Sequence, residues 1–436
     1  MTDTPGDEPR TRVLVEVTDT LSIDFTTGIQ RVVREVVAGL ARAAEFEVVP
    51  VVTPSVGAGF RTLTADESDR LSTHPAGGRA GRRADDFGPL APLVRRVGDL
   101  PVTLKLRGAV AARLRSRGEV LPAHEELALG PLTSAGIPPR SVFLDVEGSW
   151  YDPTPRSELL PLLSDAGVHR AVLVHDVMPV LYPQWFTDKH IQVFTDWLVA
   201  HLNASELFLT NSRRTANDLR SAATALGVTR ALDIRPVPLG ADYLTEPPEP
   251  VPELKRGQRY VLVVGTLEPR KNQTVVLDAM ERLWDQGIDL DLVLVGKEGW
   301  MVDRLVQRLR RHPRRSEELH WLDRVDDRKL AWLYDNAFVA VAPSIYEGLG
   351  VPVLEALGHG CATIASTGGA QPEAADGAAE LFEPTDVATL TSLLRRHVED
   401  PSHHERQRAA AAGSPRPSWA TTCQAIGAHL TDLVTG

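Results

Sequence analysis

The stretch "APSIYEGLGVPVLEALGHG", residues 342–360, carries two glutamates, Glu347 and Glu355, in an otherwise apolar run that glycines interrupt. The residues "VAVAPS" at 339–344, which lead into this stretch, predict a buried strand. Pro352 suits the first turn of a helix. The stretch therefore predicts a strand, a glycine-rich loop holding Glu347, and a helix with Glu355 near its start. A carboxylate in a partly dry site is costly unless it accepts strong hydrogen bonds. We expect both carboxylates to face a cleft. The alternative is that Glu355 only complements the N-terminus of the helix and that Glu347 is solvated.

The same alternation of short apolar runs and amphipathic segments extends over most of the chain. Buried parallel strands typically read as near-continuous apolar runs between helices. The fold class that this pattern predicts is α/β, with two doubly wound Rossmann-like domains facing each other across a cleft. The predicted strands lie at 12–17, 46–52, 141–148, 171–177, 207–212, 260–266, 290–296, 337–344 and 361–367.

The chain has 436 residues, a length at which one hydrophobic core usually divides. Prolines and charges at 243–259 predict a linker between the domains. The predicted divisions are an N-terminal domain at 1–245 with an insertion at about 54–135, a C-terminal domain at 255–410, and a C-terminal helix within 411–436.

Composition excludes several classes of protein. A net charge of −11 argues against a general nucleic-acid binder, and two cysteines give neither a disulfide framework nor a metal knuckle. The polar N-terminus does not resemble a signal peptide, so we expect a cytoplasmic protein. The segment 93–118 carries many Lys and Arg residues. It indicates either a peripheral contact with the inner face of an anionic membrane, or a solvated insertion whose helix packs on the domain.

A second motif, "GTLEPRKN" at residues 265–272, follows the first predicted strand of the C-terminal domain. Gly265 permits a tight turn and a close approach of the backbone to a ligand. Arg270 and Lys271 place two cations where a helix begins, and a diphosphate needs both cations and helix-terminal amides. A surface Arg-Lys pair at a helix start is the alternative interpretation.

These motifs together resemble the nucleotide-sugar domain of glycosyltransferase family 4, whose members are retaining transferases with the GT-B fold. The resemblance rests on "GTLEPRKN", "LVLVGKEGW" and "RVDDRKLAWLYDNAFVAVAPSIYEGLGVPVLEALGHGCATIAST", in that order. The family hallmark, Glu-x7-Glu, is matched by Glu347 and Glu355. In the first half, "TGIQRVVRE", "VHDVMPVLYP", "TNSRRTANDL" and "VPLGAD" also resemble the family, and the style of the motifs is that of mannosyl- and rhamnosyl-type transferases.

The resemblance implies catalytic roles for His175, Arg270, Lys271 and Glu347. Glu347 is expected to accept hydrogen bonds from hydroxyls of the donor sugar, and Glu355 to hold the ribose. Arg270 and Lys271 are expected to bind the diphosphate and stabilise the leaving group. His175, in the "HDV" segment that ends a predicted strand, is expected to lie beside the sugar.

Further donor contacts follow from the same resemblance. Several family members carry a basic residue where this chain has Thr266, which offers a hydroxyl but no charge. Val325 occupies a position where the family contacts the base through its backbone, which hides the identity of the base. The donor-binding residues implied besides Glu355 are Gly28, Gly265, Thr266, Val325, Gly350 and Val351.

The reaction implied is transfer of a hexosyl unit, with retention, from a nucleoside-diphosphate sugar to a hydroxyl of a saccharide, lipid-linked or small-molecule acceptor. GDP-mannose is the favoured donor. No cofactor or metal is expected, because no Asp-x-Asp motif ends a predicted strand. The resemblance also implies that the last helix crosses back to the first domain. Another GT-B enzyme, such as a sugar-nucleotide epimerase, and a noncatalytic sugar-nucleotide-binding protein are the alternatives.

Overall fold

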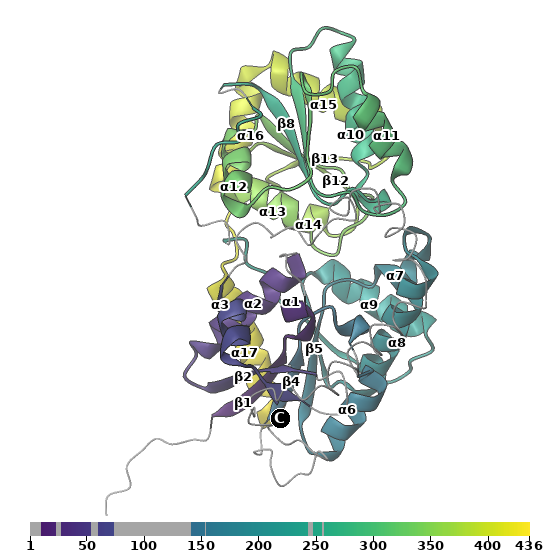
Figure 1. Ribbon diagram of the computed structural model, residues 1–436, viewed down its shortest axis with the longest axis vertical. Helices are drawn as coiled ribbons and strands as arrows, with labels where there is room; N and C mark the ends of the chain where they lie inside the picture. The colour runs from purple at the N-terminus through teal and green to yellow at the C-terminus, as the bar shows by residue number, and fades with distance from the viewer. Residues whose placement is uncertain are drawn as a thin grey trace, which may run out of the picture.

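Two α/β domains, each built on one sheet, lie one above the other in the computed structural model (Figure 1). The predicted fold class is confirmed. The segment 93–118 and most of the predicted insertion lie outside the described residues. The structure describes residues 10–22, 28–53, 60–73, 141–152, 154–242, 247–254 and 257–436.

The N-terminal sheet has the strand order β3-β2-β1-β4-β5-β6-β7, and every neighbouring pair is parallel except β2 and β3. Its central strands are mainly apolar and mostly buried, as expected when helices cover both faces. Residues of the predicted insertion take part in this fold, because Arg61 and Thr62 pair with Val52 and Val51. The strands are β1 (Thr11–Glu16), β2 (Phe46–Val52), β3 (Arg61–Thr62), β4 (Val142–Asp145), β5 (His169–Val174), β6 (Leu207–Thr210) and β7 (Asp233–Pro236). The helices are α1 (Thr18–Ser22), α2 (Gly28–Ala41), α3 (Ala65–Ser72), η2 (Ser149–Tyr151), α6 (Arg156–Asp165), α7 (Met178–Leu181), η3 (Pro183–Trp185), α8 (Asp188–Ala204) and α9 (Arg213–Ala225).

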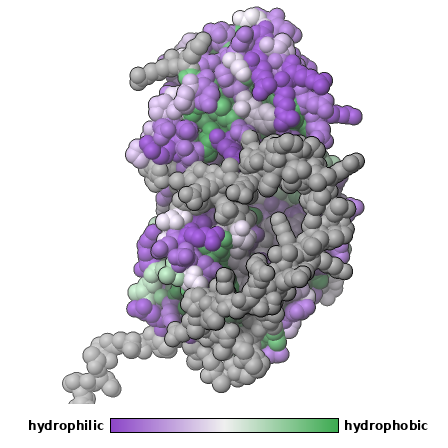
Figure 2. All heavy atoms as spheres, in the orientation of Figure 1, coloured by the Kyte–Doolittle hydropathy of each residue, from purple (hydrophilic) through white to green (hydrophobic). Residues whose placement is uncertain are grey.

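The C-terminal sheet is wholly parallel, with the order β10-β9-β8-β11-β12-β13. Its strands are β8 (Tyr260–Val264), β9 (Asp291–Val295), β10 (Leu319–Leu322), β11 (Val339–Ala342), β12 (Thr363–Ser366) and β13 (Glu380–Phe382). Its helical segments are η4 (Pro269–Lys271), α10 (Gln273–Trp284), α11 (Asp303–Arg311), α12 (Asp327–Asn336), α13 (Val351–Gly358), α14 (Gln371–Ala375), α15 (Val387–Glu399) and α16 (Pro401–Gly413). On the face shown in Figure 2, this domain presents mainly hydrophilic side chains and one smaller hydrophobic patch.

The order of the C-terminal strands reverses at β8, which has β9 on one side and β11 on the other. Chains that leave the carboxyl ends of two such strands diverge and open a crevice between them, where ligands of doubly wound sheets bind. The loops after β8 and β11 are the two predicted motifs. The fold therefore places "GTLEPRKN" beside the loop that contains Glu347.

The last helix, α17 (Trp419–Thr435), returns to the N-terminal domain, where its yellow ribbon lies beside α2 in Figure 1. Ser418 caps it by accepting a hydrogen bond from the Thr421 amide at 3.2 Å. Ile426 and Leu430 are fully buried in the same apolar core as Val33 of α2. The chain thus crosses between the domains at the linker and again before α17.

Candidate active site

The loop after β8 carries its two cations on η4, a single turn of 3₁₀ helix. Asn272 ends this turn with a left-handed backbone, φ 55°. Asn272 occupies the cap position of α10, but its side chain donates elsewhere, to the carbonyls of Pro343 at 3.1 Å and Pro384 at 2.7 Å. Because Pro343 belongs to the loop after β11, Asn272 joins the two loops of the crevice.

The loop after β11 runs from Pro343 to Gly350, and α13 begins at Val351 with Pro352 in its first turn, as predicted. Gly350 has φ 94°, a conformation that favours glycine. The amide of Ile345 donates to the carbonyl of Arg270 at 2.6 Å, a second link between the loops. The backbone amides of Gly350 and Val351 therefore stand at the positive end of α13, beside the cations of the other loop.

Glu347 is the centre of the predicted set. Its carboxylate accepts hydrogen bonds from Arg270 Nη1 at 2.8 Å, Lys271 Nζ at 2.5 Å and Ser344 Oγ at 2.6 Å. Burial raises the pKa of this carboxyl, but Lys271 and Arg270 outweigh burial and lower it to about 2. Glu347 is therefore ionised at neutral pH, with a side chain only 10% exposed.

Glu268 is a second buried carboxylate in the loop after β8, and it forms an ion pair with Arg270, whose Nη2 lies 2.7 Å from Glu268 Oε1. Burial raises the pKa of Glu268, which favours its neutral form. Arg270 thus lies between two buried carboxyl groups, and of these two only Glu347 has a lowered pKa.

His175 follows β5 at the carboxyl edge of the N-terminal sheet and meets the loop that contains Glu347. Its backbone carbonyl lies so close to Gly348 that a Cβ added there would stand 2.4 Å from the oxygen. His175 Nε2 lies 2.9 Å from the carbonyl of Val146, and a carbonyl only accepts, so Nε2 carries the proton. Burial lowers the pKa of His175, so the imidazole is neutral at pH 7.

Glu355 lies apart from this cluster, buried in α13. It accepts a hydrogen bond from Tyr334 Oη at 2.7 Å, and Arg31 Nη1 stands 3.8 Å from its other oxygen. Arg31 also donates to both oxygens of Asp327 at 2.7 Å, so α2 of one domain reaches α12 and α13 of the other. The two glutamates of the motif therefore have different surroundings.

The other predicted donor-binding residues lie along these elements. Gly28 begins α2, one turn before Arg31, and Val325 precedes α12 by two residues and packs partly buried against the core. Gly265 lies beside the Lys271 side chain, and the carbonyl of Thr266 accepts from Gln273 Nε2 at 3.0 Å. Gly28 and Val325 thus lie close in sequence to Arg31 and its partner Asp327, whereas Gly265 and Thr266 lie near Lys271.

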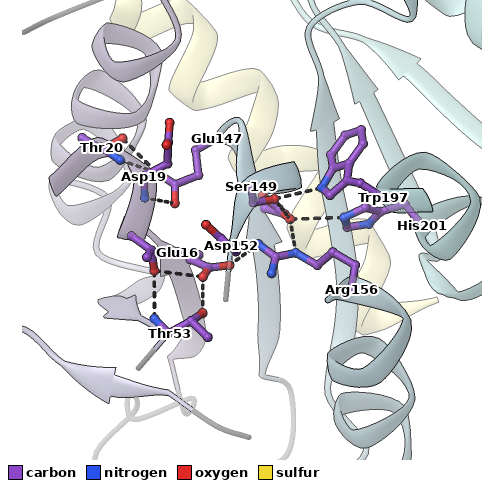
Figure 3. A network of polar contacts seen from close by, with 12 residues as sticks. Glu16, Asp19, Thr20, Thr53, Glu147, Ser149, Asp152, Arg156, Trp197 and His201 are labelled. Carbon is purple, nitrogen blue, oxygen red and sulfur yellow. Dashed lines mark hydrogen bonds and ion pairs between the residues drawn. The ribbon is translucent and has the colours of Figure 1, made fainter. Parts of the chain in front are cut away.

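A buried polar network lies in the N-terminal domain, where β1 and β4 end (Figure 3). Arg156, with 1% of its side chain exposed, forms ion pairs with Glu16, Asp145 and Asp152. Glu147 accepts hydrogen bonds from the backbone amides of Asp19 and Thr20, each at 2.9 Å, and so holds the start of α1. Val146, whose carbonyl contacts His175, lies between two residues of this network.

Sequence reasoning missed the residues that act between elements. Arg31 lies within the quoted "TGIQRVVRE", but its pairing with Asp327 joins residues 296 positions apart and leaves no periodic signal. Glu268 lies within "GTLEPRKN", but that motif was interpreted from its two cations, Arg270 and Lys271, and Glu268 was given no role. Gln371 donates to the carbonyl of Ser344 at 3.0 Å from a helix that carried no motif. Only the fold brings these side chains to the crevice.

The fold and this site define a GT-B protein, and solved structures of that fold cover nearly the whole chain. Sucrose-phosphate synthase of Thermosynechococcus elongatus has a TM-score of 0.59 at 18% identity, over 97% of this chain and 99% of that one. Anabaena HepE in complex with UDP also has a TM-score of 0.59, at 14% identity, over 97% of this chain and 100% of the other. At these identities the likeness establishes the fold alone.

Within that class, residues 248–413 match the family described as glycosyl transferases group 1. The serotype-specific mannosyltransferase WbdA of Escherichia coli is 31% identical over 207 residues, 44% of this chain and 25% of WbdA. O-antigen chain mannosyltransferase B of E. coli is 29% identical over 275 residues, covering 60% of this chain and 70% of that protein. The chain thus spans about a quarter of the length of WbdA. The predicted resemblance to glycosyltransferases of mannosyl type is confirmed.

Proposed function

We propose that this protein is a retaining glycosyltransferase that moves a sugar from a nucleoside-diphosphate sugar to the hydroxyl of a saccharide, lipid-linked or small-molecule acceptor. GDP-mannose is the donor that we favour, because several of the matched relatives are described as mannosyltransferases. The observation that carries the proposal is the meeting of Arg270, Lys271 and Glu347 in the crevice between β8 and β11.

Glu347 has the capacity to bind the donor sugar while it holds both cations. An ionised carboxylate offers about four lone-pair positions. Three are taken, by Arg270, Lys271 and Ser344, so one remains for a sugar hydroxyl. In this proposal Glu347 orients the donor, and Glu355, near Arg31, accepts from the ribose.

Arg270 and Lys271 would stabilise the departing diphosphate. Lys271 has three N–H donors and Arg270 has five, and the contacts with Glu347 and Glu268 use only some of them. The remaining donors, together with the amides at the start of α13, would meet the negative charge that develops as the glycosidic bond breaks. Preorganised donors of this kind usually provide the largest catalytic effect.

We favour retention by same-face attack over double displacement through an enzyme nucleophile: the acceptor hydroxyl would attack the face from which the diphosphate leaves, and a leaving phosphate oxygen would take its proton. His175 would lie beside the sugar as a neutral imidazole rather than as a second cation. The cleft between the domains would exclude water and so limit hydrolysis of the donor.

A thermal-shift screen of nucleotide sugars tests the identity of the donor, since a ligand that binds the native state raises Tm. We expect GDP-mannose to raise Tm more than GDP alone and more than UDP-glucose or UDP-galactose. A larger shift with a UDP-sugar would contradict the choice of donor. Incubation of the donor alone with detection of an epimerised nucleotide sugar separates the epimerase alternative.

Metal independence of the transfer is a separate part of the proposal. We expect transfer rates to be unchanged by EDTA, measured well below Tm so that any structural ion does not affect folding. A rate that falls with EDTA and returns with Mg²⁺ or Mn²⁺ would contradict it.

A further inference from the structure

A cluster of one glutamate and two histidines lies in the C-terminal domain and takes no part in the proposed reaction. Glu380 begins β13, His397 lies in the last turn of α15, and His403 lies in the first turn of α16. His397 and His403 are 0% and 4% exposed, and Glu380 is 14% exposed. One ligand atom from each residue lies within 4.8 Å of the other two.

The three side chains converge on one carboxylate oxygen. His397 Nε2 lies 2.8 Å, and His403 Nε2 3.1 Å, from Glu380 Oε2. Zinc binds imidazole nitrogen and carboxylate oxygen at about 2.0–2.2 Å, so ligand atoms around one tetrahedral ion stand about 3.3–3.6 Å apart. The two observed separations are those of metal-free hydrogen bonds, so the ligand atoms would move apart by a few tenths of an ångström to admit the ion. Two histidines and a glutamate also form a known zinc ligand set.

The neighbouring groups fix the ligands. Asp400 caps α16 by accepting a hydrogen bond from the backbone amide of His403 at 2.9 Å, which sets the turn between α15 and α16. His397 Nδ1 lies 3.0 Å from His404 Nδ1, and the ring of His404 stacks on Phe338 with 4.0 Å between centroids. Histidines that bind metal typically use the second ring nitrogen in such a hydrogen bond.

From this geometry we propose that Glu380, His397 and His403 bind one zinc ion, with a fourth position for water. Without the ion, each imidazole donates its Nε2 proton to Glu380. On zinc binding, the proton of each ring would move from Nε2 to Nδ1, and the lone pair of each Nε2 would bind zinc. The Nδ1–H group of His397 would then donate a hydrogen bond to His404 Nδ1.

The ion would be structural rather than catalytic. Glu380 is the first residue of β13, so it lies at the amino edge of the parallel sheet, whereas the loop containing Glu347 leaves the carboxyl edge. α15 and α16 lie in the upper part of the C-terminal domain in Figure 1. Zinc would tie both helices to the edge strand, and its effect would be on the stability of this domain.

The test is equilibrium dialysis of the full chain against zinc sulfate after removal of metals by chelator, with zinc counted by mass spectrometry. We expect about one zinc per wild-type chain. His397→Ala is expected to abolish this zinc. His403→Gln keeps an amide that can donate to Glu380, so it preserves the hydrogen bond but removes the ligand, and we expect affinity to fall at least about tenfold.

The matched control is His169→Gln, which removes a histidine paired with Glu206 at 3.2 Å in the N-terminal domain. It should bind zinc as the wild type does, and zinc should raise the Tm of both but not that of His397→Ala. A wild type that retains no zinc, or variants that bind it as tightly as the wild type, would overturn the proposal. Donor binding is measured apart from zinc, so failure of the proposed transferase activity would leave this result unaffected.

Discussion

Glu347 is held by two cations and one hydroxyl, and this decides its protonation. A group whose folded pKa is lowered contributes stability that is present above its unfolded pKa and is lost as pH falls through the folded value. The pKa of Glu347 falls from 4.5 to about 2. Its contribution, on the order of 3 kcal/mol at most, should therefore disappear between about pH 4.5 and pH 2.

Glu347→Gln tests this effect. We expect the free energy of unfolding of the wild type to fall more steeply than that of the variant as pH decreases from 5 to 3. Urea unfolding at a series of pH values measures the difference. Parallel curves for the two proteins would show that the ion pairs with Arg270 and Lys271 do not hold the carboxylate ionised.

Lys271 provides a prediction about turnover. Lys271→Ala removes a cation that we propose stabilises the leaving diphosphate, so kcat should fall at least about 100-fold. Lys329→Ala is the matched control, because Lys329 is a more exposed lysine near Glu249 and Asp326. Steady-state release of nucleoside diphosphate measures both. Similar rates for the two variants would remove Lys271 from the catalytic set.

At the scale of elements, the ends of β1 and β4 depend on one buried cation. Arg156 is surrounded by Glu16, Asp145 and Asp152, and the pKa of Asp152 is raised to about 10, mainly by its burial. Removal of one partner of a buried ion pair typically costs about 3–5 kcal/mol.

Arg156→Met should therefore destabilise the N-terminal domain by about that amount. Arg12→Met, which breaks an exposed pair with Glu47 at 3.0 Å, should cost less than about 1 kcal/mol. Chemical unfolding of both variants makes the comparison, and equal losses would contradict the importance of burial. If Arg156→Met does not fold, Arg156→Lys retains a charge and is expected to be intermediate.

The elements themselves were largely predictable, because buried parallel strands have a continuous apolar signal. The predicted strand at 46–52 matches β2 (Phe46–Val52), and the helix predicted near Pro352 matches α13. The edge strand β13 (Glu380–Phe382) was missed because it is short and mixes a charge with exposed Leu381. The side chain of Asn272 bridges two loops, a tertiary contact that local sequence does not encode.

For the whole molecule, the loop after β11 is also the junction between the domains. Ser212 and Thr215 of the N-terminal domain donate to the carbonyl of Gly348 at 2.5 and 2.9 Å. Tyr346 donates to Asp218 at 2.6 Å, and Trp300 donates to the carbonyl of Trp185 at 2.8 Å. The loop that contains Glu347 thus meets the N-terminal residues of the candidate site only where the two domains are in contact. Among the helices of the described residues, none is both long and apolar enough to cross a membrane.

Gly348→Ala should separate the domains, because the new Cβ would stand 2.4 Å from the carbonyl oxygen of His175. Gly358→Ala is the control, since a Cβ at Gly358 meets no atom within 4 Å. We expect small-angle scattering to give a larger radius of gyration for Gly348→Ala than for the control, with donor affinity reduced at least about tenfold. Identical scattering and affinity would show that the junction tolerates a side chain.

The pairing of glutamate with both cations was within reach of sequence, because the motifs that carry them follow adjacent strands of a doubly wound sheet. The contacts that Arg31 and Ser212 make between the domains depend on how the domains meet, so the sequence did not predict them. The role of Glu355 toward the ribose stays a prediction.

The most direct test of the central claim is product analysis by NMR after incubation with GDP-mannose and a panel of alkyl mannoside and lipid-linked acceptors. We predict an α-mannoside and GDP in equal amounts with the wild type, and at least about 100-fold less of both with Lys271→Ala. A product of inverted configuration, or equal product from the wild type and the variant, would contradict the account.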